Sequence, residues 1–78
     1  MNTKYSKQAE KFLDKQNDKT FFRIVAAVDK LPEGDVRKMR GYNDLFRLRI
    51  GDFRILYRVN KEGIFIDSID NRGQAYKD

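Results

Sequence analysis

Four arginines gather in one short stretch of this chain. Two precede a Gly-Asp pair and two follow it: Arg47, Arg49, Arg54 and Arg58. Residues 37–58 hold seven basic and two acidic side chains, an excess that equals the net charge of +5 for the whole chain. A guanidinium group stays charged and binds two phosphate oxygens at once. The pattern therefore predicts a polyanionic partner or substrate, and RNA is the one we expect.

The residue types that are missing narrow the chemistry. The 78 residues contain no Cys and no His, which excludes disulfides, thiolate metal sites, thiol nucleophiles and His-based acid–base catalysis. We therefore expect no metal and no cofactor. The N-terminal segment lacks the apolar run of a signal peptide, and no stretch is apolar enough to span a bilayer. These observations predict one cytoplasmic domain over residues 1–78.

Two helices are predicted in the first half of the chain. The first, about 10 residues long, has Ser6 as its N-cap and an apolar face formed by Tyr5, Ala9, Phe12 and Leu13. The second, about 14 residues long, begins at a cap on Asp18 and stops before Pro32. Its apolar face consists of Phe21, Ile24, Val25, Val28 and Leu31.

The second half changes to the alternating pattern of strands. Residues 45–50 and 53–59 alternate around the two-residue turn Gly51-Asp52, apart from Leu56. Residues 60–63 predict a second turn that leads to a strand at 64–69, and residues 36–39 form a further candidate strand. We therefore expect an α+β fold in which the two helices pack on an antiparallel sheet of three or four strands.

Strand register converts the alternation into two different faces. With Gly51-Asp52 as the turn, Arg49 faces Arg54, and all four arginines share the face opposite the apolar residues. The core face then holds Phe46, Leu48, Ile50, Phe53, Ile55, Tyr57 and Val59. Like charges directly opposite one another destabilise a sheet, which indicates that a bound anion relieves them. The alternative is an ordinary solvated face whose edge charges resist aggregation, with Asp67 as the nearby acidic partner.

Nearly the whole chain resembles a known family. The segments that carry the likeness are residues 31–41, the hairpin 45–57 with its Arg-Leu-Arg-Ile-Gly-Asp-Phe-Arg sequence, and the C-terminal residues 71–77. They are similar to the RelE/ParE superfamily of type II toxins, which implies the RelE-like microbial RNase fold. RelE-type toxins cut messenger RNA in the ribosomal A site, whereas ParE-type toxins poison DNA gyrase. Both imply a cognate antitoxin as partner, and the hairpin favours the RelE branch.

The resemblance also implies roles for particular residues. The catalytic positions matched are Arg47, Arg49, Arg54, Arg72 and Tyr76. Attack of the substrate 2′-OH on the adjacent phosphate would leave a 2′,3′-cyclic phosphate and a 5′-OH. We expect Arg54 and Arg72 on the phosphate, and Arg47 and Arg49 along the RNA backbone. Tyr76 would act as acid or base or stack on a base, or would simply pack on the sheet.

Further RNA contacts are expected from residues around the hairpin: Arg37, Lys38, Arg40, Arg58 and Tyr42. Phe65 is a second exposed aromatic candidate beside the basic face. The chain departs from the family in two places, since Asn71 stands where many members have His and Gly73 where some have Arg. Because arginine is a poor general base, Asp67 and Asp70 remain as carboxylate candidates. The alternatives are a gyrase inhibitor without catalysis and a degenerate RNA-binding homologue.

Overall fold

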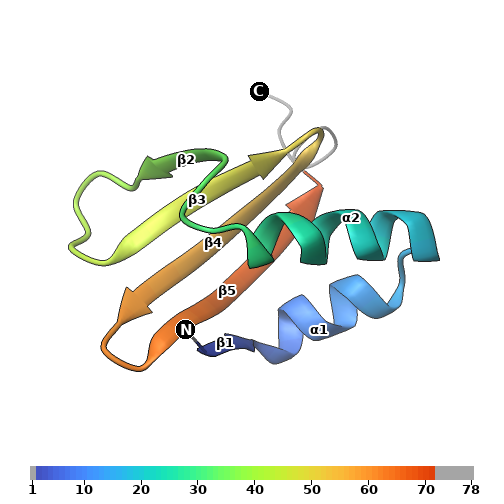
Figure 1. The fold of residues 1–78 in the computed structure, drawn as a ribbon, viewed down its shortest axis with the longest axis horizontal. Coiled ribbons are helices and arrows are strands. Elements are labelled where there is room, and N and C mark those ends of the chain that lie inside the picture. Colours follow the sequence, from blue (N-terminus) through green and yellow to red (C-terminus); the bar gives the residue numbers. More distant parts are fainter. Residues whose placement is uncertain (1, 72–78) are drawn as a thin grey trace.

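A five-stranded sheet and two helices make up the computed structural model, which describes residues 2–71. The elements in chain order are β1 (Asn2–Tyr5), α1 (Lys7–Asp14), α2 (Asp18–Asp29), β2 (Asp35–Lys38), β3 (Leu45–Ile50), β4 (Phe53–Asn60) and β5 (Gly63–Asn71). Across the sheet the order is β1-β5-β4-β3-β2, as Figure 1 shows. Only β1 and β5 run parallel. The predicted α+β class is confirmed, but the sheet is mixed and larger than the antiparallel sheet of three or four strands that we expected.

The strand that the sequence did not reveal is β1. Tyr5, which we expected on the first helix, ends this strand, and α1 starts only after Ser6. Ser6 is the predicted N-cap, because its Oγ accepts a hydrogen bond from the backbone N–H of Ala9 at 3.0 Å. β1 approaches β5 at Gly63, which has φ 137° and where a Cβ would collide with the carbonyl oxygen of Asn2. Only glycine permits that approach.

Ser6 and Gln8 continue the pairing of β5 where β1 stops. The backbone N–H of Ser6 donates to the Ile66 carbonyl at 2.9 Å, and the Ser6 hydroxyl donates to the Asp67 carbonyl at 2.9 Å. The Gln8 amide then both donates to the Ile69 carbonyl (3.0 Å) and accepts from the Ile69 N–H (2.9 Å). The backbone N–H and C=O groups along this part of the β5 edge therefore find hydrogen-bond partners in Ser6 and Gln8 rather than in another strand.

The second helix begins one residue earlier than expected. Asn17 is its N-cap, accepting from the backbone N–H of Thr20 at 2.8 Å, while Asp18 lies in the first turn. A carboxylate there still interacts favourably with the positive end of the helix dipole. The helices are 8 and 12 residues long, slightly shorter than their periodicity predicts. None of the helices in residues 2–71 is long and apolar enough to cross a membrane.

One core joins both helices to one face of the sheet. Its buried residues are Ala9, Leu13, Ile24, Val28, Leu48, Ile55, Tyr57, Ile64, Ile66 and Ile69. Aromatic side chains complete its margin, with Phe12 edge-on to Phe53 at 5.9 Å and Phe46 stacked on Tyr57 at 5.5 Å between ring centroids. Every residue predicted for the core face of the hairpin lies in this core or packs against it. We call this side of the sheet the core face and the other side the open face.

Candidate nucleic-acid interface

The hairpin register places the arginines together on the open face. β3 and β4 pair with Arg49 opposite Arg54 and Ile50 opposite Phe53, which confirms the predicted register. Because side chains alternate along a strand, Arg47, Arg49, Arg54 and Arg58 all point away from the core. Both helices pack on the core face, and Figure 1 shows α2 crossing the sheet on one side.

A row of four charged residues crosses the open face near the hairpin turn. Asp35 on β2 pairs with Arg49 on β3, which pairs with Arg54 on β4, which pairs with Asp70 on β5. Side chains opposite one another have Cβ atoms about 5 Å apart. Two adjacent guanidinium groups are therefore flanked by a carboxylate on each side. The sequence did not predict this alternation of charge across strands.

Two ion pairs hold arginines of this face. Arg47 Nη2 lies 3.4 Å from Asp35 Oδ1, and Arg58 Nη1 lies 3.2 Å from Asp44 Oδ1. The sequence interpretation named Asp67 as the nearby acidic partner, and that was wrong for these two arginines. Asp67 falls at the irregularity in the β4–β5 ladder, where Leu56 pairs with Ser68 and Tyr57 with Ile66. A bulge of this kind cannot be located from residue types alone.

The arginine side chains of the open face differ in how firmly their surroundings hold them in place. The Arg47 side chain is only 14% exposed, and the Nε atoms of Arg47 and Arg54 are both buried. Arg49 is exposed, and the Arg58 side chain is 40% exposed. Arg47 and Arg54 are therefore positioned by their surroundings, whereas Arg49 can reorient in solvent. Fixed donors beside adaptable ones suit a phosphate that must be held in one geometry.

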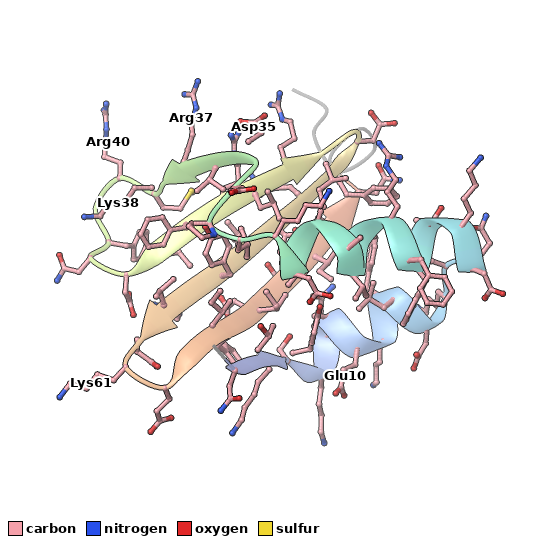
Figure 2. All side chains as sticks on the ribbon, in the orientation of Figure 1. Glu10, Asp35, Arg37, Lys38, Arg40 and Lys61 are labelled. Atoms are coloured by element: carbon pink, nitrogen blue, oxygen red, sulfur yellow. The ribbon has the colours of Figure 1, made fainter. Side chains whose placement is uncertain are left out.

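The edge at β2 brings some of the predicted RNA contacts to this face and leaves one out. Arg37 pairs with Arg47 and shares its face, and Figure 2 shows Arg37 and Arg40 extending away from this edge. Tyr42, in the following loop, is 54% exposed. Lys38 pairs with Phe46 and so belongs to the core-face side of the edge. The structure therefore does not bring Lys38 to the arginines.

A hollow lies at the other end of the open face, beyond Arg58. Its volume is about 370 Å³, and its lining residues are Asn2, Lys4, Asn60, Glu62, Gly63, Ile64 and Phe65. Phe65 pairs with Arg58 on one side and with Lys4 on the other, and is 37% exposed. Sequence reasoning singled out Phe65 but missed Lys4 and the two asparagines, because their position depends on β1.

Two expected site residues, Arg72 and Tyr76, lie outside the described residues. β5, which precedes them in the chain, ends at Asn71 opposite Phe53. Among residues 2–71, no group of three or more His, Cys, Asp or Glu side chains could hold a metal ion. The resolved pKa shifts fall on the core side of the molecule. Burial raises the pKa of Tyr57 above 10.0, and burial together with the negative charge of Asp29 raises that of Tyr5.

Comparison with known proteins identifies the relatives of this fold. The family model described as ParE toxin of the type II toxin-antitoxin system parDE matches residues 3–76. The archaeal RelE–RelB complex from Pyrococcus horikoshii contains a chain 30% identical to this one, with a TM-score of 0.75 and coverage of 95% of this chain and 97% of that chain. The RelB–RelE complex from Methanococcus jannaschii gives 23% identity and a TM-score of 0.74 over 92% and 93%.

A third similar structure is the YoeB dimer from Staphylococcus aureus, with 22% identity and a TM-score of 0.71 over 87% of this chain and 92% of that chain. No protein of curated function matches the chain significantly. The two structures below 25% identity support the fold alone. The family model and the Pyrococcus chain support membership of the family, because they match the sequence as well.

Proposed function

The chain belongs to the RelE/ParE superfamily of toxins of type II toxin–antitoxin systems, and on that basis we propose that it is a ribosome-dependent endonuclease that cuts messenger RNA. The observation that carries the proposal is the placement of Arg49 directly opposite Arg54 on a face that no described helix covers. Folding alone disfavours that pair. A phosphate between the two guanidinium groups is attracted to both of them, so their closeness favours its binding.

The reaction we propose needs only RNA and proton transfers. The 2′-oxygen of one nucleotide attacks the adjacent phosphorus, and the bond from phosphorus to the 5′-oxygen breaks. The 2′-OH proton leaves to a base, and the departing 5′-oxygen gains a proton. The products are a 2′,3′-cyclic phosphate and a 5′-OH. The protein must hold these atoms in line and stabilise the negative charge that grows on the phosphate oxygens.

Arg54 is the residue we assign to the reacting phosphate. Its Nε is buried and its neighbours on both strands are charged, so its guanidinium is held in place, as the stabilisation of a developing charge requires. Arg49 contacts the same phosphate from β3, and Arg47, paired with Asp35, positions the RNA backbone. By the family resemblance, Arg72 is a further phosphate ligand and Tyr76 an acid–base or stacking residue.

The proton acceptor cannot be a histidine, because the chain has none. Arginine holds its proton above pH 12 or so, which leaves a carboxylate as the protein group best suited to accept the 2′-OH proton. Asp70 lies opposite Arg54 across the β4–β5 ladder, a position in which the two Cβ atoms are about 5 Å apart. We assign the general base to Asp70. Asp67 is not placed opposite Arg54, because it falls at the irregularity in the β4–β5 ladder.

A gyrase-inhibiting toxin without catalysis is the second candidate function. The family model that matches the chain carries the ParE description, and this observation favours it. The helices argue the other way, because ParE-type toxins are expected to use an extended helical hairpin and α1 and α2 have only 8 and 12 residues. Under this alternative the open face would serve only as a surface for a protein partner.

Primer extension on a reporter messenger RNA, with and without ribosomes in a reconstituted translation reaction, separates these functions. We expect the wild-type chain to cut only ribosome-bound RNA and Arg54→Ala to lose about 10²–10³-fold in cutting rate. Lys11→Ala is the control, because Lys11 is an exposed cation on α1, and this helix packs on the core face. If wild type leaves the RNA intact under both conditions, the nuclease proposal is wrong. Gyrase poisoning is then the next assay.

A further inference from the structure

The hollow at the far end of the open face combines an aromatic ring, amides, a carboxylate and a cation. From the register, Asn2, Lys4, Asn60 and Phe65 all lie on the same face as the arginines. We propose that this hollow is a second RNA subsite, which takes one unpaired base of the strand whose phosphate lies on Arg54. The proposal rests on the proposed function for its ligand, but nothing in the reaction itself requires it.

Phe65 supplies the surface for stacking. It is one of three large apolar side chains exposed among residues 2–71, and the only one of them that belongs to the sheet. Its neighbours across the strands are Arg58 and Lys4, so the ring lies between two cations. An aromatic side chain among cations is the usual platform for single-stranded nucleic acid, since every base has a π-face and every nucleotide a phosphate.

The size of the hollow is compatible with one base. A volume of about 370 Å³ is at the small end of ligand pockets. Gly63 forms part of its lining without a side chain, and the absence of a Cβ there keeps β1 close to β5. The hollow therefore depends on the pairing of β1 with β5. Its walls are formed by hydrogen-bonded strands of the sheet and by the turn between β4 and β5.

The polar groups around the hollow indicate which base edge they prefer. Asn60 Oδ1 already accepts from the backbone N–H of Glu62 at 2.8 Å, so its amide can offer N–H donors to a base. The Glu62 carboxylate only accepts hydrogen bonds. A donor amide beside an acceptor carboxylate matches cytosine, which presents a carbonyl oxygen next to an exocyclic amino group, whereas uracil has no amino group. We therefore expect the subsite to discriminate against uracil.

The distance between the two subsites matches one continuous strand of RNA. Arg54 and Arg58 lie on the same strand and face, so about 13 Å separates their positions at 3.3 Å per residue. A few nucleotides of extended RNA span that length. Arg58 donates from Nη1 to Asp44 while 40% of its side chain remains exposed, and it provides a phosphate contact along the way together with Lys4.

Binding of uncleavable RNA tests the subsite without needing catalysis. The probes are fluorescent 2′-O-methyl oligocytidylates, a dinucleotide and a hexanucleotide, titrated into the purified full chain at low salt and followed by anisotropy. We expect the hexanucleotide to bind wild type more tightly than its phosphate count predicts. Phe65→Ala should remove about ten-fold of that affinity and leave dinucleotide binding unchanged. Phe22→Ala is the matched control, a phenylalanine 65% exposed on α2, and should change neither.

Two further variants test the contacts separately. Lys4→Ala should weaken hexanucleotide binding and reduce its salt dependence by about 0.7 in the log–log slope. Glu62→Gln should reduce the preference for oligocytidylate over oligouridylate of the same length. Thermal melting of each variant distinguishes lost binding from lost fold.

The results distinguish this proposal from the proposed nuclease function. If lengthening the probe gives wild type no added affinity, or if Phe65→Ala binds the hexanucleotide as wild type does, the subsite does not exist, even where ribosome-dependent cutting is established. If Phe65→Ala loses affinity for the antitoxin while RNA binding is unchanged, the hollow belongs to a protein partner and the proposal is overturned. Length-dependent binding without any cutting supports the subsite and contradicts only the nuclease assignment.

Discussion

The two faces of this sheet follow opposite rules. On the core face, β3, β4 and β5 place apolar residues opposite one another, as Leu48 pairs with Ile55 and Ile55 with Ile69, all of them buried. On the open face the same strands place Arg49 opposite Arg54. The core face is what a stable sheet requires, whereas the open face places two like charges side by side, with Asp35 and Asp70 flanking them. Under the proposed function, this difference arises because the open face binds a ligand.

Adjacent residues on β4 give the largest expected contrast between the faces. Ile55 is fully buried on the core face and Leu56 is half-buried on the open face, opposite Arg47. Ile55→Ala should lower the free energy of unfolding by about 2–5 kcal/mol, enough to unfold much of so small a domain. Leu56→Ala should cost about 1 kcal/mol or less. Urea unfolding followed by circular dichroism measures both, and equal losses would mean that the faces do not differ.

Asp70→Asn tests the open face through the chemistry. The change keeps the shape of the side chain but removes the group that we assign as proton acceptor. Single-turnover cutting at neutral pH should fall about 100-fold. Binding of uncleavable RNA should stay near the wild-type value. An unchanged cutting rate would contradict the assignment of Asp70 as the proton acceptor.

Alkaline pH should destabilise the molecule through its core side. Burial raises the pKa of Tyr57 in the folded state above 10.0, whereas the unfolded chain ionises at the ordinary value. The unfolded state therefore releases its proton first, so this contribution to stability is fully present below pH 10 and is lost above it. Urea midpoints measured at about pH 9 and about pH 11 should drop less for Tyr57→Phe than for wild type. An equal drop in both proteins would contradict the assignment.

Arg49→Thr should give the smallest change in stability, and it should stabilise the protein rather than destabilise it. Removing one of two opposed guanidinium groups relieves repulsion, and Asp35, the other cross-strand neighbour of Arg49, keeps its ion pair with Arg47. Because Thr also suits a strand, the unfolding free energy should rise by about 0.2–1 kcal/mol. The gain should shrink at high salt as screening weakens the repulsion. Arg37→Thr is the control at the edge strand, where we expect a smaller gain. A destabilised Arg49→Thr would mean that the arginine row supports the fold.

The hairpin was the most predictable part of the structure. Strict alternation around Gly51-Asp52 fixes both register and face, so the clustering of Arg47, Arg49 and Arg54 followed from the sequence. Pro32 and Ser6 likewise marked helix limits through local backbone chemistry. These features depend on residues close together in the chain.

Features that depend on distant residues were not predictable. β1 pairs with a strand some 60 residues away, and only four residues form it, so no local period reveals it. The acidic partners Asp35 and Asp70 reach the arginines through strand order and through a bulge in β5. The hollow beside Phe65 was not predictable either, because its walls come from β1, β4 and β5 and therefore depend on how these strands pair.

Measuring stability and cutting on the same samples of Arg54→Ala tests the central claim most directly. The claim is that Arg54 serves the cutting of RNA more than the stability of the fold. We predict that the cutting rate on ribosome-bound RNA falls about 10²–10³-fold, while the unfolding free energy stays within about 1 kcal/mol of wild type. An unchanged cutting rate would contradict the claim. So would a rate loss accompanied by destabilisation as large as that of Ile55→Ala.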